Sequence, residues 1–216
     1  MAAGLDKDMI VEVPVKGYFN ENCYFYIDDE TKHGFLIDPG AEAKKLLKLI
    51  SDKGWNIEKI LLTHGHFDHT GAVNEIRDAL GIPVIAHINS DQYLLDGYMN
   101  LSAQCGSSII IGGVEYTNDG DILALEANPD FKLKVIYTPG HTTDSIIFYS
   151  ERDLVAFVGD TIFKGCIGNY KYPGGNFKDL QDSIIDKIFT LPDETILLSG
   201  HSDKTTVGIE RRRFRL

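Results

Sequence analysis

The segment Leu61-Leu62-Thr63-His64-Gly65-His66-Phe67-Asp68-His69 decides how this chain of 216 residues is interpreted. An apolar strand leads directly into four side chains that can bind metal, in the pattern H-x-H-x-D-H. With 7 histidines in the chain, chance would produce this pattern roughly once in a thousand sequences or less. Side chains at i and i+2 of an extended segment share one side, so His64 and His66 should aim at one point. Asp68 and His69 would reach a neighbouring point, which predicts two adjacent metal ions.

One loop cannot complete two coordination spheres, so further ligands are expected at other strand ends. Three candidates each follow an apolar strand and a glycine: His141 after Pro139-Gly140, Asp160 after Val158-Gly159, and His201 after Ser199-Gly200. Glycine lets the backbone turn sharply at such positions. A lone His or Asp after a strand is more often a capping or core-edge residue, but the H-x-H-x-D-H cluster favours metal binding for all three.

The predicted site divides seven ligands between two divalent metal ions: His64, His66 and His141 at the first, Asp68, His69 and His201 at the second, and Asp160 bridging both. Imidazole and carboxylate suit zinc, the first choice, and also iron and manganese. A hydroxide bridging the pair would be the nucleophile of a hydrolysis that needs no protein nucleophile. Asp68 is also the candidate catalytic residue, because it could orient the water or accept its proton.

Three further residues near strand ends are interpreted without a ligand role. His33 is expected in a solvated turn spanning residues 28–34, and His87 at a strand end. Asp38, in Asp38-Pro39-Gly40, suits a turn, but it could also accept the second N–H of a ligand imidazole. The second role is favoured for Asp38.

The hydrophobic pattern around these motifs predicts strands alternating with helices. Expected strands are 9–15, 23–27, 35–37, 59–62, 83–86, 133–137, 145–149, 154–158 and 195–198. Expected helices run from 41 to Gly54, after His69 to Leu80, from 89 to 97 and from 180 to 189, whereas 101–118 gives no clear pattern. Each half has strands followed by helices, which predicts an α/β (α+β) fold, a four-layer αβ/βα sandwich in one domain spanning residues 1–216.

Composition narrows the function classes. Lys and Arg number 21 against 32 Asp and Glu, a formal net charge of -11, so no nucleic-acid partner is expected. The basic end, Arg211-Arg212-Arg213-Phe214-Arg215, is interpreted as solvated. No apolar run reaches the length of a membrane span, and the N-terminus lacks a secretory signal, so a cytoplasmic protein without membrane attachment is expected. The oligomeric state is left open.

The three cysteines, Cys23, Cys105 and Cys166, are an odd number without C-x-x-C spacing. This count fits a reducing compartment and argues against a disulfide framework or a cysteine-rich zinc site. Metal ligands must therefore be histidines and carboxylates.

Five motifs, in this order, resemble the metallo-β-lactamase superfamily and most closely its glyoxalase II-like branch of small hydrolases. They are Leu36-Ile37-Asp38-Pro39-Gly40, Thr63 to His69, Thr138-Pro139-Gly140-His141-Thr142, Gly159-Asp160-Thr161-Ile162-Phe163 and Ser199-Gly200-His201. The resemblance implies the αβ/βα fold, a site between the sheets, and metal ligands at the seven residues already named. Asp160 stands where the best-known lactamases carry cysteine, so the chain is similar to thioesterase-type members. A C-terminal helical domain that helps glyoxalase II bind glutathione is not expected after His201.

The chain departs from related small hydrolases near the expected substrate. Asn169 and Lys171 stand where those proteins commonly have Arg and Asp, and Ser202-Asp203 stands where they have Gly-Pro. Substrate-binding candidates in this region, which could present cations and phenols to a carboxylate or belong to a solvated loop, are Lys164, Tyr170, Lys171 and Tyr172.

The leading hypothesis is a dinuclear hydrolase of thioesters or related acyl esters, acting on a small-molecule acyl substrate. The alternatives are a mononuclear iron persulfide dioxygenase, a lactonase, and a phosphodiesterase or nuclease of the same superfamily. A purely structural metal role is disfavoured, because structural zinc sites are closed by four protein ligands.

Overall fold

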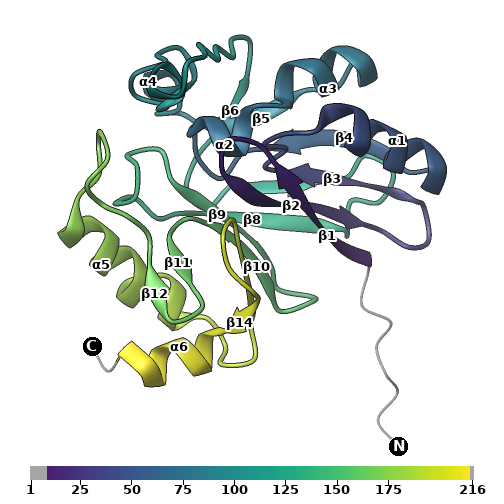
Figure 1. The fold of residues 1–216 in the computed structure, drawn as a ribbon. Helices are drawn as coiled ribbons and strands as arrows, with labels where there is room; N and C mark the ends of the chain where they lie inside the picture. The colour runs from purple at the N-terminus through teal and green to yellow at the C-terminus, as the bar shows by residue number, and fades with distance from the viewer. Residues whose placement is uncertain (1–8, 215–216) are drawn as a thin grey trace, which may run out of the picture.

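The computed structural model describes residues 9–214, which form two six-stranded β-sheets packed face to face (Figure 1). The first sheet has the strand order β1 (Met9–Lys16), β2 (Asn20–Ile27), β3 (His33–Ile37), β4 (Asn56–Leu61), β5 (Val84–His87) and β6 (Glu115–Thr117). The second has the order β14 (Thr205–Thr206), β13 (Ile196–Ser199), β10 (Val155–Gly159), β9 (Ile146–Ser150), β8 (Lys132–Tyr137) and β7 (Ile122–Ala124). A separate hairpin joins β11 (Ile162–Phe163) to β12 (Cys166–Ile167).

Helices cover the outer faces of both sheets (Figure 1). The longer ones are α1 (Ala43–Lys53), α3 (Val73–Leu80), α5 (Phe177–Asp186) and α6 (Val207–Phe214). Single turns are α2 (Phe67–Thr70), α4 (Asp91–Leu94), η1 (Ser102–Cys105) and η2 (Ile188–Thr190). The resulting αβ/βα sandwich confirms the predicted fold class.

The apolar core has three parts, one between each pair of adjacent layers. On β2, Tyr24 and Tyr26 face the second sheet, while Phe25 and Ile27 join the cluster beneath α1 and α3. Successive strand residues point to opposite faces, so a strand covered on both sides is apolar throughout. Tyr26 packs against Phe131 with ring centroids 4.3 Å apart. This aromatic contact fixes one sheet against the other.

Most predicted elements are present, with ends shifted by a few residues. The helix predicted for 89–97 is wrong in length, because α4 is a single turn. Beyond it, the Asp96 carboxylate accepts the backbone N–H of Tyr98 at 2.7 Å, which forms a turn instead. The predicted helix after His69 is divided into α2 and α3, because Ala72 donates its backbone N–H to the Pro39 carbonyl at 2.9 Å. In 101–118 the structure has η1, a loop and the edge strand β6.

The basic end is largely paired within the protein. Arg211 lies 2.7 Å from Asp193 and Arg213 lies 3.0 Å from Glu210, while Arg215 is outside the described residues. The three cysteines are free thiols. No helix within residues 9–214 has both the length and the apolar character that crossing a membrane requires.

Candidate metal centre

The predicted ligands follow four strands whose ends lie at one edge of the sandwich. The Thr63-to-His69 segment follows β4, and His141, Asp160 and His201 follow β8, β10 and β13. Strands β10 and β13 are parallel, and β9 is antiparallel to both β8 and β10, so β8, β10 and β13 share one direction. Their C-terminal ends therefore meet at the same place, opposite the end of β4.

The first group of predicted ligands is tightly convergent. His64 Nε2 lies 3.2 Å from His66 Nδ1, and His141 Nε2 lies 2.9 Å from the same atom. All three side chains are buried. The structure thus brings together His64, His66 and His141 from two different sheets.

The second group converges beside the first. His69 Nε2 lies 3.3 Å from His201 Nε2, which lies 3.1 Å from Asp68 Oδ2. Asp160 stands between the groups: its Oδ1 is 3.3 Å from His69 Nε2, and its Oδ2 is 3.5 Å from His201 Nε2 and 3.7 Å from His141 Nε2. Asp160 thus lies within 3.7 Å of ring nitrogens from both groups.

Outer hydrogen bonds determine which ring nitrogen of three of the histidines faces the centre. The Nδ1–H of His141 donates to the Asn169 carbonyl at 2.7 Å, and that of His201 donates to the Asn20 carbonyl at 2.7 Å. His69 Nδ1 donates to Asp38 Oδ2 at 3.0 Å. Since carbonyls and carboxylates only accept, these bonds fix the first proton of each ring on Nδ1, so Nε2 is the atom that a metal ion or a second proton would occupy.

These inward-facing nitrogens fit a cation. The Nε2 atoms of His69 and His201 lie 3.3 Å apart, and two unprotonated nitrogens at that distance would repel one another unless positive charge lay between them. Asp160 Oδ1 is buried beside them with no hydrogen-bond donor. A set of imidazoles and carboxylates with unsatisfied acceptors is the donor set that divalent metals take.

Asp38 orients the centre from behind. Its Oδ1 accepts the Thr63 backbone N–H at 2.8 Å and its Oδ2 accepts the Thr63 hydroxyl at 2.6 Å, in addition to His69 Nδ1. Asp38 therefore contacts the outer nitrogen of His69 and holds the start of the ligand loop. This is the supporting role favoured from the sequence.

The pKa is lowered for three of the five histidines at the centre and raised for the other two. Burial is the main cause that lowers the pKa of His64, His66 and His141, that of His66 to about 3. Burial would also lower the pKa of His69 and His201. The Asp160 carboxylate beside His69 and the Asp68 carboxylate beside His201 outweigh it and raise the pKa of both.

The two carboxylates remain ionised despite burial. Burial would raise the pKa of Asp160, but the charges of His69, His201 and His141 hold it well below its ordinary value. Burial also opposes ionisation of Asp68, and the hydrogen bond with His201 followed by the charge of His69 keeps its pKa low. Negative charge is therefore available to a metal at neutral pH.

Sequence reasoning missed two buried acids near the centre. Glu21 is 1% exposed, lacks a hydrogen-bond partner on either oxygen, and lies 3.9 Å from His69 Nδ1. Burial, the largest cause, raises its pKa well above the ordinary value. Asp144 is fully buried near the backbone of Gly65, within the ligand loop. In the sequence, neither acid belongs to a pattern that marks burial.

Two histidines without a predicted ligand role and two of the substrate candidates lie apart from the centre. The prediction that His33 lies in a turn is wrong, because His33 begins β3. Its Nδ1 lies 2.7 Å from Glu58 Oε1. His87 ends β5 and stacks on Tyr137 with centroids 4.4 Å apart. Lys164 binds Asp203 at 2.9 Å, and Tyr170 packs on Phe177.

A cavity of about 310 Å³ opens onto the centre. It is lined by Phe19, Asn20, His66, Asp68, Leu101, His141, Asp160, Phe163, Asn169, Tyr172 and His201. Of the four substrate candidates from the sequence, Tyr172 lines this cavity, whereas Lys164, Tyr170 and Lys171 do not.

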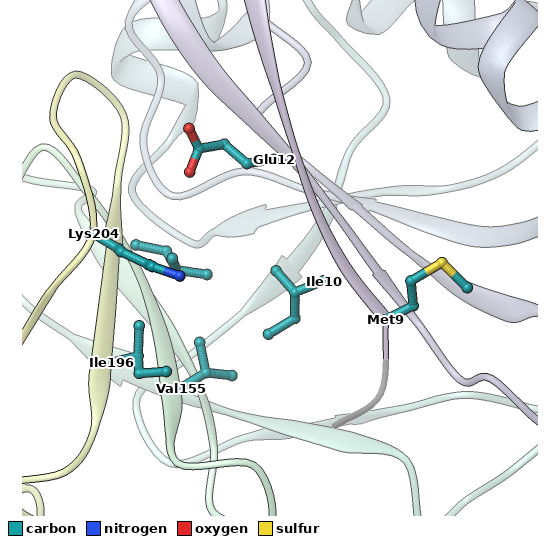
Figure 2. A pocket seen from close by; sticks show the side chains of 7 residues that line it. Met9, Ile10, Glu12, Val155, Ile196 and Lys204 are labelled. Carbon is teal, nitrogen blue, oxygen red and sulfur yellow. The ribbon is translucent and has the colours of Figure 1, made fainter. Parts of the chain in front are cut away.

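A second hollow, of about 420 Å³, opens between β1 and the strands β10 and β13 (Figure 2). Its walls are Met9, Ile10, Val155, Ile196 and Leu198, with Glu12 and Lys204. These residues include no histidine and only one acid, so they do not form a metal-binding set. The smaller cavity is the candidate active site.

Close packing at Gly200 depends on the absence of a side chain. A Cβ there would lie 2.3 Å from His69 Cε1 and 2.7 Å from Asp160 Oδ1. The glycine before His201 therefore lets His69 on α2 and Asp160 after β10 lie close to His201.

Comparisons of the sequence and the structure with known proteins identify one family. The family model of the metallo-β-lactamase superfamily matches residues 17–201. Hydroxyacylglutathione hydrolase GloC of Haemophilus influenzae is 33% identical over 207 residues, covering 94% of this chain and 96% of that protein.

Two solved structures match most of both chains. The B3 metallo-β-lactamase BLEG-1 has a TM-score of 0.88 at 34% identity, covering 94% of this chain and 97% of its own. TTHA1623 in a di-iron-bound form has a TM-score of 0.82 at 35% identity, covering 93% and 98%. Fold, motif order and sequence identity agree: the chain belongs to the metallo-β-lactamase superfamily.

Proposed function

We propose that this protein is a dinuclear metal-dependent hydrolase of thioesters or related acyl esters. Membership of the superfamily implies divalent metal ions. The observation that carries the dinuclear proposal is the position of Asp160, whose two oxygens lie within 3.7 Å of ring nitrogens from both ligand groups. The relationship to GloC supports a thioester as the substrate.

The proposed chemistry divides between metals and side chains. Bound metal ions would supply a water of lowered pKa and stabilise negative charge on the substrate carbonyl oxygen. His64, His66 and His141 would hold one ion, Asp68, His69 and His201 the other, and Asp160 both. Asp68 lines the cavity and is ionised, so one of its oxygens can accept the proton that the attacking water loses.

The test is reconstitution of metal-free protein with zinc, iron or manganese, followed by a panel containing a hydroxyacylglutathione, simpler thioesters and a lactone. A β-lactam belongs in the panel because BLEG-1 is a metallo-β-lactamase. We expect thioester turnover with about two metal ions per chain, and a loss of about 10²- to 10⁴-fold in kcat for Asp68→Asn.

Two results would contradict the proposal. One is a metal-loaded protein that hydrolyses no member of the panel while Asp160→Ala leaves metal content unchanged. The other is a single iron per chain with oxygen consumption on a persulfide, which would establish the dioxygenase alternative instead.

A further inference from the structure

The wall of the active-site cavity around the metal ligands is largely apolar. Phe19, Leu101, Phe163 and Tyr172 form most of it, and we name these four the apolar collar. The other lining residues apart from ligands are Asn20 and Asn169. Among the described residues that line this cavity there is no lysine or arginine.

The backbone of Leu101, one of the collar residues, is strained. Its φ is 71°, a left-handed conformation that is unfavourable for a residue with a Cβ. The residue is only 7% exposed. Strained residues persist where the surroundings over-determine them, and they cluster at functional sites.

Hydrogen bonds of the preceding residue, Asn100, hold the backbone of Leu101 in this conformation. The buried Asn100 amide donates to the Tyr93 carbonyl at 3.0 Å and to the Ile109 carbonyl at 2.8 Å, and its oxygen accepts from the Ser102 N–H at 3.0 Å. The Asn100 carbonyl accepts the Phe67 backbone N–H at 3.0 Å. Leu101 is thereby connected, through the preceding residue Asn100, to the helical turn that carries Asp68 and His69.

The other collar residues flank both ligand groups. Tyr172 lies edge-on to His66 with centroids 5.7 Å apart, and Phe163 lies 6.2 Å from His201. Phe19 is 45% exposed and packs on Phe67 at 6.0 Å. Apolar side chains therefore flank ligands of both groups.

Charge near the cavity does not favour anionic substrate groups. The Lys164 ammonium is paired with Asp203 at 2.9 Å, and Lys171 lies outside the cavity lining. The protein as a whole carries a formal net charge of -11. A substrate carboxylate held against the wall, away from the metal ligands, would meet apolar or amide groups and lose hydration without gaining a lysine or arginine partner.

We propose that the site selects uncharged thioesters or esters with an apolar acyl chain, and that Leu101 is a specificity-determining residue. This inference rests on the proposed function, because it names the substrate class of the same site. It predicts discrimination both by chain length and by charge.

The substrate test compares acetyl, butyryl and hexanoyl thioesters of N-acetylcysteamine with hexanoylglutathione, on zinc-loaded full-length protein. We expect kcat/KM to rise about threefold for each added methylene. The uncharged hexanoyl thioester should exceed its glutathione counterpart at least tenfold. If the glutathione thioester is hydrolysed equally well or better, the selectivity proposal is overturned while the thioesterase proposal stands. If none is hydrolysed, the proposed function itself fails.

The variant test uses residues that accept a positive φ. Leu101→Asn and Leu101→Gly both suit a left-handed backbone, so each should fold while removing the apolar contact. Each should lose about tenfold more kcat/KM on the hexanoyl than on the acetyl thioester. Leu154→Asn is the matched control, since Leu154 also has a positive φ of 49° but packs against the core cluster on the outer side of the second sheet, and it should retain the wild-type dependence on chain length. A chain-length dependence that survives both Leu101 variants would refute the role of Leu101.

Discussion

Asp144 is a buried acid that belongs to the scaffold of the ligand loop. Its carboxylate lies 3.3 Å from the position that a Cβ on Gly65 would occupy, between His64 and His66. Both oxygens are buried without a well-formed hydrogen bond. Burial raises its pKa from 3.8 to about 6, only partly offset by nearby Thr142 and Ser90. At neutral pH the fold therefore holds an ionised group that it would accommodate better when protonated.

This gives a prediction for stability against pH. A carboxyl whose pKa is raised on folding destabilises the protein progressively as the pH rises from about 4 to about 6. Asp144→Asn removes that titration. The unfolding free energy of the variant relative to wild type should increase by about 2–3 kcal/mol between pH 4 and pH 7. Chemical denaturation of both metal-free proteins across this range measures it.

The control is Asp78→Asn, which removes an exposed carboxyl from α3. It should leave the pH dependence of unfolding close to that of wild type. A constant difference between Asp144→Asn and wild type at every pH would show that Asp144 has its ordinary pKa in the folded protein.

Local spacing explains which site residues were predictable. The ligands of the Thr63-to-His69 segment stand close together in the chain, and His141, Asp160 and His201 repeat a strand–glycine–ligand pattern. Glu21 sits between two asparagines on β2 and resembles an exposed strand residue. Its burial behind His69 depends on packing between layers, which no local pattern encodes.

The N-terminus of α5 is fixed by Asn176. The Asn176 side-chain oxygen accepts the backbone N–H groups of Lys178 at 2.8 Å and Asp179 at 3.2 Å. The backbone N–H of Asn176 donates to the Gly140 carbonyl at 2.8 Å. This bond connects the helix to the turn that carries His141. The side chain caps the helix, while the backbone positions the ligand turn.

Separating these two roles gives a prediction. Asn176→Ala removes the cap and should lower the unfolding free energy by about 1 kcal/mol. Zinc affinity should stay within about twofold of wild type, because the backbone bond to Gly140 is retained. Asn176→Asp keeps an acceptor at the cap and should restore stability. Equal destabilisation by both variants would mean that capping is not the cause.

Element length explains where the sequence was less informative. Long amphipathic elements such as α1, which ends at Gly54 with φ 65°, were predicted closely. The hairpin β11–β12 has two residues in each strand, too few to show a period of two. The predicted helix at 89–97 failed because a side chain, Asp96, redirects the backbone after one turn. Short elements depend on such individual contacts rather than on hydrophobic pattern.

The centre joins the two halves of the molecule. His64, His66, Asp68 and His69 come from the first sheet and its α2 turn, whereas His141, Asp160 and His201 come from the second. Hydrogen bonds also cross between the halves near the site: Ile146 N–H to the Thr63 carbonyl at 2.9 Å and the Tyr24 hydroxyl to the Ser199 carbonyl at 2.7 Å. The sandwich should therefore fold without metal but gain stability when metal links its sheets.

Metal removal should consequently lower the melting temperature without unfolding the protein at 25 °C. A ligand that binds only the folded state stabilises it by about 4 kcal/mol at a free concentration 1,000 times its Kd. We expect the melting temperature to rise with zinc concentration and to fall with chelator. His141→Ala and His201→Ala should each reduce this increment, because each removes a ligand supplied by the second sheet to a different group. His33→Gln, which changes a histidine paired with Glu58 away from the centre, should retain it. If both ligand variants kept the full increment, metal would be bound elsewhere and would not join the sheets.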